Sequence, residues 1–299
     1  MKLKSEYWAK LKLVFPLKPV IFSALLVSIT SANAEISISS FPYEQKFETN
    51  DYASQMVRVT GGATHTWLPS GGWRDSGGAK ITAPNSNDSD AGIGAINFQG
   101  SIRSVNQINV RFLVYHGSTW QELAANNKVI ILDGVDRSQR PMIISRDTGA
   151  TGEEYVAYGA CAGTTCNYKG GGLRPDNSDT FRIGNPPLAR EAEWISVELE
   201  ANVAEAYIKV YIYTQDGVIS GEYVRQHLYV DGNANPASPP GDTSWSRLDL
   251  IGGYLHGSVQ ANDPNNYFIL DEVKISDSYI GPPAGFLSDP PPKGPTLVE

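Results

Sequence analysis

The sequence predicts an all-β protein, and three observations support that prediction. From residue 35 onward, short runs of strand-forming residues are separated by Gly, Pro, Asn and Asp, and the chain has 29 glycines and 19 prolines to make such breaks. Within the runs, apolar and polar residues alternate with the period of two that is typical of a half-buried strand. Almost no stretch has apolar residues at helical spacing, and no linker or repeat interrupts the middle, so we expect one β domain.

The first 34 residues have the pattern of a secretory signal peptide. An apolar run from Pro19 to Ile29 is followed by Ala32-Asn33-Ala34, which fits the small-residue cleavage rule, and several lysines precede the run. A membrane anchor is the alternative, but the run is shorter than the roughly 20 residues that span a bilayer. We expect a secreted or periplasmic protein that does not insert into a membrane. Its predicted parts are a signal peptide at 1–34, a β domain at 35–281 and a Pro-rich tail at 282–299.

Without the signal peptide, the chain keeps 19 basic and 31 acidic residues, a net charge of −12. Such an acidic protein is a poor partner for nucleic acid, whose phosphates bind basic surfaces. The charge also argues against a strongly anionic polymer as ligand, unless Arg111 and Lys209 form a local positive patch. We expect a monomer.

The two cysteines, Cys161 and Cys166, are separated by four residues of a Gly/Thr-rich turn. In an exported protein such a pair is expected to form a disulfide, whereas a metal site would need further ligands nearby that the sequence lacks. The closed loop is short, so we expect a stabilisation at or below the low end of about 2–4 kcal/mol.

The segment from Tyr267 to Ser276 is the clearest predicted strand. Its residues alternate between two sets, Tyr267/Ile269/Asp271/Val273/Ile275 and Phe268/Leu270/Glu272/Lys274. If the first set faces the core, the carboxylate of Asp271 lies among apolar residues, where a cation or hydrogen-bond donors must satisfy it. The strand and the Ile280-Gly281-Pro282 that follows resemble the closing strand of the concanavalin A-like lectin/glucanase jelly rolls, which include polysaccharide lyases. The resemblance implies a jelly-roll β-sandwich of two antiparallel sheets with a concave binding face.

The segment from Phe41 to Glu48 is similar to the first strand of these jelly rolls, in which an acidic residue often meets the Asp of the last strand at a calcium ion. The resemblance therefore implies a structural Ca²⁺ held by Glu48, Asp51 and Asp271, with oxygen ligands at about 2.3–2.6 Å. The alternative is a solvated edge strand whose acidic residues face water.

Two tryptophans lie among glycines in the segment from Trp67 to Ala79. Glycines let a loop bend closely around a ligand, and an exposed indole offers a flat apolar platform for a sugar ring. Trp73 is therefore a candidate carbohydrate-binding residue. A tryptophan can equally fill the core of a sandwich, and that alternative stays open.

Three further predicted strands, at 107–120, 194–200 and 207–213, have one apolar face and one face of polar or aromatic residues. Tyrosines on such a face can stack on a sugar and donate a hydrogen bond, although tyrosine is also a good strand former on a plain exposed face. If these strands share a sheet, their second faces line one groove for a polysaccharide. The candidate binding residues, besides Trp73, are Tyr115, Glu198, Tyr207, Lys209 and Gln215.

Two kinds of enzyme stay possible beside a binding protein. A lyase that cleaves a uronic-acid polymer by β-elimination needs a group that neutralises the carboxylate, a base and an acid. The run from Tyr207 to Tyr211 is similar to the Tyr-x-Lys strand of alginate-lyase-type enzymes, and the resemblance implies catalytic roles for Arg111, His116, Tyr211 and Tyr213. A glycosidase needs two carboxyls about 5–10 Å apart. Glu198 and Glu200 are spaced suitably on a strand, but the glucanase signature is missing.

Overall fold

The computed structural model describes the part of the chain from residue 36 to residue 287, with gaps, and all of it lies in the unit from Asn33 to Glu299. The described ranges are 36–59, 64–82, 91–117, 127–135, 140–146, 153–162, 165–169, 181–182, 193–215, 217–226, 242–250 and 267–287. The predicted signal peptide therefore lies outside the described residues. None of the helices in these ranges is long and apolar enough to cross a membrane.

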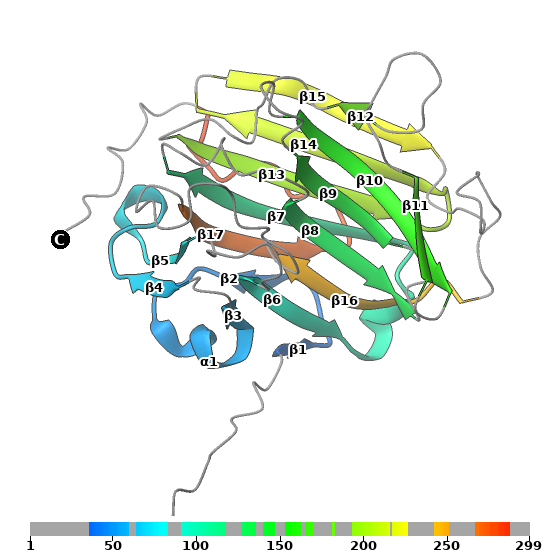
Figure 1. Cartoon of the computed structure of the whole chain (residues 1–299), viewed down its shortest axis with the longest axis horizontal. Coiled ribbons are helices and arrows are strands. Elements are labelled where there is room, and N and C mark those ends of the chain that lie inside the picture. The colour runs from blue at the N-terminus through cyan, green and yellow to red at the C-terminus, as the bar shows by residue number, and fades with distance from the viewer. Residues whose placement is uncertain are drawn as a thin grey trace, which may run out of the picture. The chain divides into compact units, whose positions relative to one another are not determined.

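The described strands form two sheets, which confirms the predicted all-β sandwich (Figure 1). Sheet A has the order β1 (Ile36–Ile38), β6 (Ala91–Phe98), β16 (Trp245–Leu250), β8 (Asn127–Gly134), β9 (Arg140–Arg146), β10 (Glu153–Ala162) and β11 (Thr165–Lys169), with β3 (Val57–Val59) beside β6 and β12 (Phe181–Arg182) beside β10. Sheet B has the order β15 (Gly217–Gln226), β14 (Tyr207–Thr214), β13 (Trp194–Asn202), β7 (Gln107–His116), β17 (Tyr267–Ser276), β5 (Gly78–Thr82) and β4 (His65–Leu68), with β2 (Tyr43–Gln45) beside β17.

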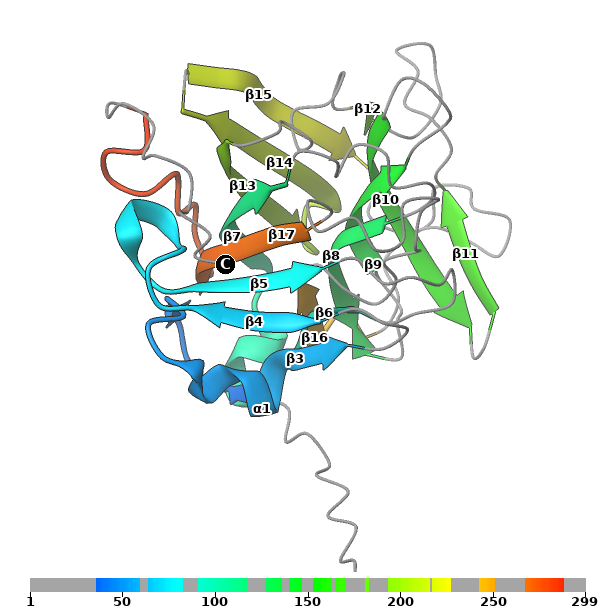
Figure 2. The same ribbon diagram turned by 60° about the vertical axis from the view of Figure 1, so that its left-hand side comes forward.

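Strand pairing in both sheets is antiparallel, apart from the parallel pair of β1 and β6. The few helices are single turns at the edge of this framework, and Figure 2 shows α1 next to β3. They are η1 (Asn50–Tyr52), α1 (Ala53–Met56), η2 (Trp73–Asp75) and η3 (Gly100–Ser104). The sandwich is the architecture that the resemblance to jelly rolls implies.

The hydrophobic core lies between the sheets, because side chains of both belong to one buried cluster. Phe112 and Leu199 of sheet B and Leu132 and Leu248 of sheet A are all fully buried in it. The apolar set predicted for each of β7, β13 and β14 faces this core, as the period of two requires. We call this side of sheet B its inner face and the opposite side its outer face.

The closing strand β17 departs from the predicted alternation. Its pairing with β7 shifts register between Asp271 and Lys274, and Glu272 has a φ of 49°, which marks a β-bulge. The extra residue reverses the side-chain parity, so Phe268 and Leu270 join Val273 in the core. The prediction that Asp271 shares a face with Val273 and Ile275 is therefore wrong, and Asp271 lies on the outer face.

The two cysteines lie on neighbouring strands of sheet A. In the antiparallel pair of β10 and β11, Cys161 is directly opposite Cys166 in the backbone register. The register favours the predicted disulfide, which stays a prediction.

Candidate functional site

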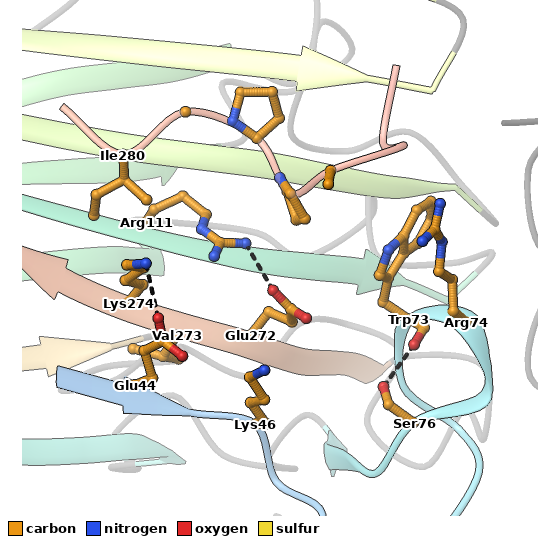
Figure 3. Close-up of a pocket in the computed structure, with 14 residues that line it drawn as sticks. Glu44, Lys46, Trp73, Arg74, Ser76, Arg111, Glu272, Val273, Lys274 and Ile280 are labelled. Atoms are coloured by element: carbon orange, nitrogen blue, oxygen red, sulfur yellow. Dashed lines mark hydrogen bonds and ion pairs between the residues drawn. The ribbon is translucent and has the colours of Figure 1, made fainter. Parts of the chain in front are cut away.

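A pocket of about 550 Å³ lies on the outer face of sheet B (Figure 3). It is found where three segments meet: β17, the segment after β17, and the loop between β4 and β5, residues 69–77, which we call the Trp73 loop. Four cationic and two acidic side chains line it, together with aromatic and aliphatic groups. The charged ones are Lys46, Arg74, Arg111 and Lys274, against Glu44 and Glu272. The pocket therefore has an excess of positive charge, in a chain whose net charge is −8.

The register of sheet B lines up one residue from each of five strands, and the first three of these residues line the pocket. Glu44 of β2 pairs with Lys274 of β17, Lys274 with Arg111 of β7, and Arg111 with Glu198 of β13. Glu198 pairs in turn with Tyr211 of β14. We call these five residues the cross-strand row. Directly opposed side chains interact, and Lys274 Nζ forms an ion pair with Glu44 Oε1 at 2.7 Å.

Arg111 is the buried centre of the row. Its side chain is only 6% exposed, and Nη1 donates a hydrogen bond to Glu272 Oε2 at 3.2 Å. Its Nε is buried and has no hydrogen-bond partner among the described residues. A buried donor without a partner costs about 1–3 kcal/mol. Arg111 also lines the pocket, so its guanidinium contributes positive charge to the cavity.

Asp271 fixes the Trp73 loop beside the pocket. Its Oδ2 accepts hydrogen bonds from Trp73 N at 2.8 Å and Ser76 Oγ at 2.6 Å, and its Oδ1 accepts one from Glu272 N at 2.6 Å. Position 72 must be glycine, because a Cβ atom there would collide with this carboxylate. Burial raises the pKa of Asp271 to about 7. Hydrogen-bond donors thus satisfy the buried carboxylate, and in return it holds the loop and the bulge in place.

The three residues predicted to bind calcium do not come together. Among the residues in the described ranges, no three His, Cys, Asp or Glu side chains form a group that could hold a metal ion. Asp51 Oδ1 accepts from Thr49 Oγ1 at 2.7 Å, and Glu48 Oε2 accepts from Gly77 N at 3.3 Å. Because N–H and O–H donors surround Asp271, these residues do not fit a calcium ion. Calcium binding stays a prediction, and melting with and without a chelator would test it.

The segment after β17, residues 277–287, lies over the outer face of sheet B, and we call it the strap. The N–H groups of Ile280 and Gly281 donate to the two carboxylate oxygens of Glu198, at 2.9 and 2.8 Å. Further along, the ring of Phe286 is fully buried, with its centroid 4.9 Å from that of Trp73. Phe286, which lies within the tail predicted at 282–299, thus packs as a core residue does, and the predicted domain boundaries stay a prediction.

His116 does not meet the other residues predicted to be catalytic. It follows Arg111 by five positions on β7, so the two side chains point to opposite faces, about 16 Å apart along the strand. His116 has the parity of Phe112, which faces the core, and burial lowers the pKa of His116 to about 3. The predicted lyase set of Arg111, His116 and Tyr211 or Tyr213 therefore does not converge on one point.

Four of the side chains predicted to bind carbohydrate are buried, with at most 8% of their surface exposed. They are Trp73, Tyr115, Glu198 and Gln215. Trp73 and Tyr115 belong to an aromatic cluster on the outer face that also includes Trp194, Tyr267 and Phe286. Trp73 is therefore buried in this outer-face cluster and not in the core between the sheets, and it also lines the pocket. Gln215 Oε1 accepts a hydrogen bond from Trp194 N at 3.3 Å.

The tyrosines of β14 share the outer face, as the sequence predicted, but they lie next to the strap and do not line the pocket. Tyr207, Lys209, Tyr211 and Tyr213 are all half-buried. Lys209 Nζ lies 4.9 Å from the centroid of the Tyr207 ring. The Tyr213 hydroxyl is 2.6 Å from that of Tyr279 in the strap, and the Tyr211 and Tyr279 ring centroids are 4.9 Å apart.

Most of the charged residues of the pocket were missed by the sequence analysis. Arg111 and Trp73 were predicted, whereas Lys46, Arg74 and Lys274 were not. A signal was present for two of them, since Arg74 directly follows Trp73 and Lys274 lies on the polar set of the closing strand. That these cations come together in one pocket depends on the register of β2 against β17, and no local sequence pattern indicates that register.

Comparisons with known proteins give a weak structural likeness. No family model matches the chain, and no curated protein matches it. Among solved structures, it is similar to the cellulose induced protein Cip1, with a TM-score of 0.45 and 11% identity over 81% of this chain and 100% of that one. It is also similar to the alginate lyase vAL-1 from Chlorella virus, with a TM-score of 0.41 and 9% identity over 72% and 89%. TM-scores below 0.5 are too low to assign a family or a function.

Proposed function

We propose that this protein is a secreted carbohydrate-binding protein whose pocket on sheet B binds a polysaccharide that has carboxylate groups. The observation behind the proposal is the charge of the pocket, where Lys46, Arg74, Arg111 and Lys274 outnumber Glu44 and Glu272. A cationic hollow on an acidic protein attracts anionic groups locally, although the net charge repels them.

The remaining lining of the pocket suits a sugar better than it suits a small inorganic anion. Trp73 and Ile280 contribute apolar surface, and Pro282 and Pro283 continue it. A sugar acid has both kinds of surface, since its carboxylate seeks cations and the C–H groups of its ring pack on aromatic or aliphatic groups. Secretion rests on the signal peptide predicted at 1–34, which lies outside the described residues.

The alternative of a polysaccharide lyase has less support, because His116, one of its predicted catalytic residues, has the parity of the inner face. A glycoside hydrolase has less support still. Both oxygens of Glu198 accept hydrogen bonds from the strap, and both oxygens of Glu200 accept them from Tyr207 and Tyr211. Neither carboxyl is free to act on a substrate in this arrangement.

Binding of the mature chain, residues 35–299, to polygalacturonate, alginate and a neutral glucan tests the proposal. We expect retention on the two acidic polymers only, because the pocket selects for carboxylates. The double variant Lys46→Gln/Lys274→Gln should weaken this binding about tenfold or more, since each lost charged contact is worth about 1 kcal/mol. Lys80→Gln is the matched control, because Lys80 lies over Tyr267 on the same sheet, away from the pocket.

Three results would change this conclusion. Equal binding of the neutral glucan would remove the role of the cations, and absence of binding to every polymer would end the proposal. A rise in ultraviolet absorbance during the incubation would reveal the unsaturated sugar that β-elimination makes, and it would favour the lyase alternative.

A further inference from the structure

The strap forms one wall of the pocket. Of its residues, five in succession, from Ile280 to Ala284, line the cavity opposite the charged side chains of β7 and β17 (Figure 3). Two of the five are prolines, Pro282 and Pro283, whose φ angles are fixed by their rings. The wall is therefore short, stiff and largely apolar, and it faces a floor that is charged.

Each end of this wall is attached to the sheet by a different kind of contact. At its start, Ile280 and Gly281 donate their backbone N–H groups to Glu198. Just after its end, Phe286 inserts its ring between the aromatic groups of the outer face and is fully buried. Because these attachments hold the wall at both ends, they set its distance from Arg111.

Glu198 is the residue of the sheet that receives the strap. It is 1% exposed, and burying a carboxylate is costly unless hydrogen bonds compensate. Besides the two N–H groups of the strap, it accepts a hydrogen bond from Asn109 Nδ2 at 2.7 Å. An apolar residue would pack under a loop at lower cost, but it would not fix which backbone groups lie above it. A carboxylate that accepts two successive N–H groups fixes the position of the strap to one residue.

We infer that the strap, held by Glu198 and Phe286, determines the selectivity of the pocket, with Glu198 as a positioning residue that does not touch the ligand. The inference rests on the proposed function. An open cationic surface binds any polyanion by charge alone, and salt weakens that binding steeply. A fixed apolar wall adds contact with the C–H surface of a sugar ring and so fixes where the anionic group lies against the cations. A carboxylate bonded directly to the ring is therefore favoured over a sulfate ester, which projects further from its ring.

The test compares polygalacturonate with dextran sulfate as ligands of the mature chain, at low and at moderate salt concentration. The wild-type protein should prefer polygalacturonate by about tenfold or more. Glu198→Gln should reduce that preference toward one and make the remaining binding more sensitive to salt, because the amide offers an N–H group where the strap needs an acceptor. Glu200→Gln is the matched control, since Glu200 is a buried neighbour on the same face and has no bond to the strap, and it should keep the wild-type ratio.

A second variant keeps the test decisive if Glu198→Gln does not fold. Gly281 has a φ of 73°, and a Cβ atom there would lie 3.4 Å from the Tyr279 ring, so Gly281→Ala should displace the strap without touching the sheet. It should lower the preference as Glu198→Gln does. If both variants, or whichever of them folds, keep the wild-type preference for polygalacturonate over dextran sulfate, the inference is overturned, but the proposal of carboxylate binding still stands. Absence of wild-type binding to polygalacturonate would instead end the proposed function, and this inference with it.

Discussion

The two faces of β13 are equally buried, but by different means. On the inner face, Val197 and Leu199 pack against sheet A in the hydrophobic core. On the outer face, Ser196 and Glu198 are covered by no second sheet, and Glu198 is hydrogen-bonded to the strap. Burial alone therefore does not identify a core. The inner face of β13 is held by apolar area, whereas its outer face combines an aromatic cluster at Trp194 with directed hydrogen bonds at Glu198.

The largest loss of stability is expected from a substitution on the inner face. Leu199→Ala should lower the free energy of unfolding by about 2–5 kcal/mol, because it removes fully buried methyl groups and leaves a cavity between the sheets. Urea unfolding of the purified variant measures this. A loss below about 1 kcal/mol would contradict the distinction between the faces, since it would mean that the inner face is loosely packed.

A substitution of the adjacent residue on the outer face, Glu198, should lower the stability less. Glu198→Gln should lower the free energy of unfolding by about 1–3 kcal/mol, because one N–H group of the strap loses its acceptor. The effect should be largest on the strap, so proteolysis after Tyr279, measured against the wild-type rate, should become faster. Unchanged proteolysis together with a large loss of global stability would show that Glu198 supports the sheet and not the strap.

The pH dependence of stability should have opposite signs for a buried residue of the inner face, His116, and one of the outer face, Asp271. The pKa of His116 falls from 6.5 to about 3, so an unfolded chain takes up a proton that the native protein does not, and stability falls as the pH drops below about 6.5. The pKa of Asp271 rises from 3.8 to about 7, so the native protein keeps a proton that the unfolded chain has lost, and stability falls as the pH rises from about 4 to 7. The two effects oppose each other between pH 4 and 6.5.

Variants of these two residues should therefore shift the pH profile in opposite directions. Relative to wild type, His116→Gln should make the protein comparatively more stable at pH 4.5 than at pH 7, and Asp271→Asn should do the reverse. Denaturant midpoints at the two pH values measure both. Shifts of the same sign would mean that at least one of the two pKa directions is wrong.

The smallest effect is expected at Ser196. Its hydroxyl is buried on the outer face and has no hydrogen-bond partner among the described residues, so Ser196→Ala should change the free energy of unfolding by less than about 0.5 kcal/mol or increase it slightly. Thermal melting at one pH is sufficient to measure this. A loss above about 1 kcal/mol would indicate that the hydroxyl is satisfied after all, for example by water.

The sequence analysis predicted what depends on local alternation and missed what depends on distant backbone contacts. The apolar sets of β7, β13 and β14 were correct, because strand parity follows directly from a period of two. The bulge at Glu272 was missed, since it inserts a residue without changing the strand-like composition. The attachment of the strap was also missed, because no local pattern indicates that Gly281 N–H donates to a carboxylate 83 residues earlier in the chain.

The place of β17 in sheet B has a consequence for folding during synthesis. The last strand of the described chain lies inside the sheet, between β7 on one side and β5 and β2 on the other. Until residue 276 has left the ribosome, the hairpin of β4 and β5 has no neighbour to join, and sheet B stays in two unconnected pieces. Pairing over such sequence distances is slow. Sheet B can therefore be completed only after β17 has been made, and β17 then joins two pieces that come from much earlier parts of the chain.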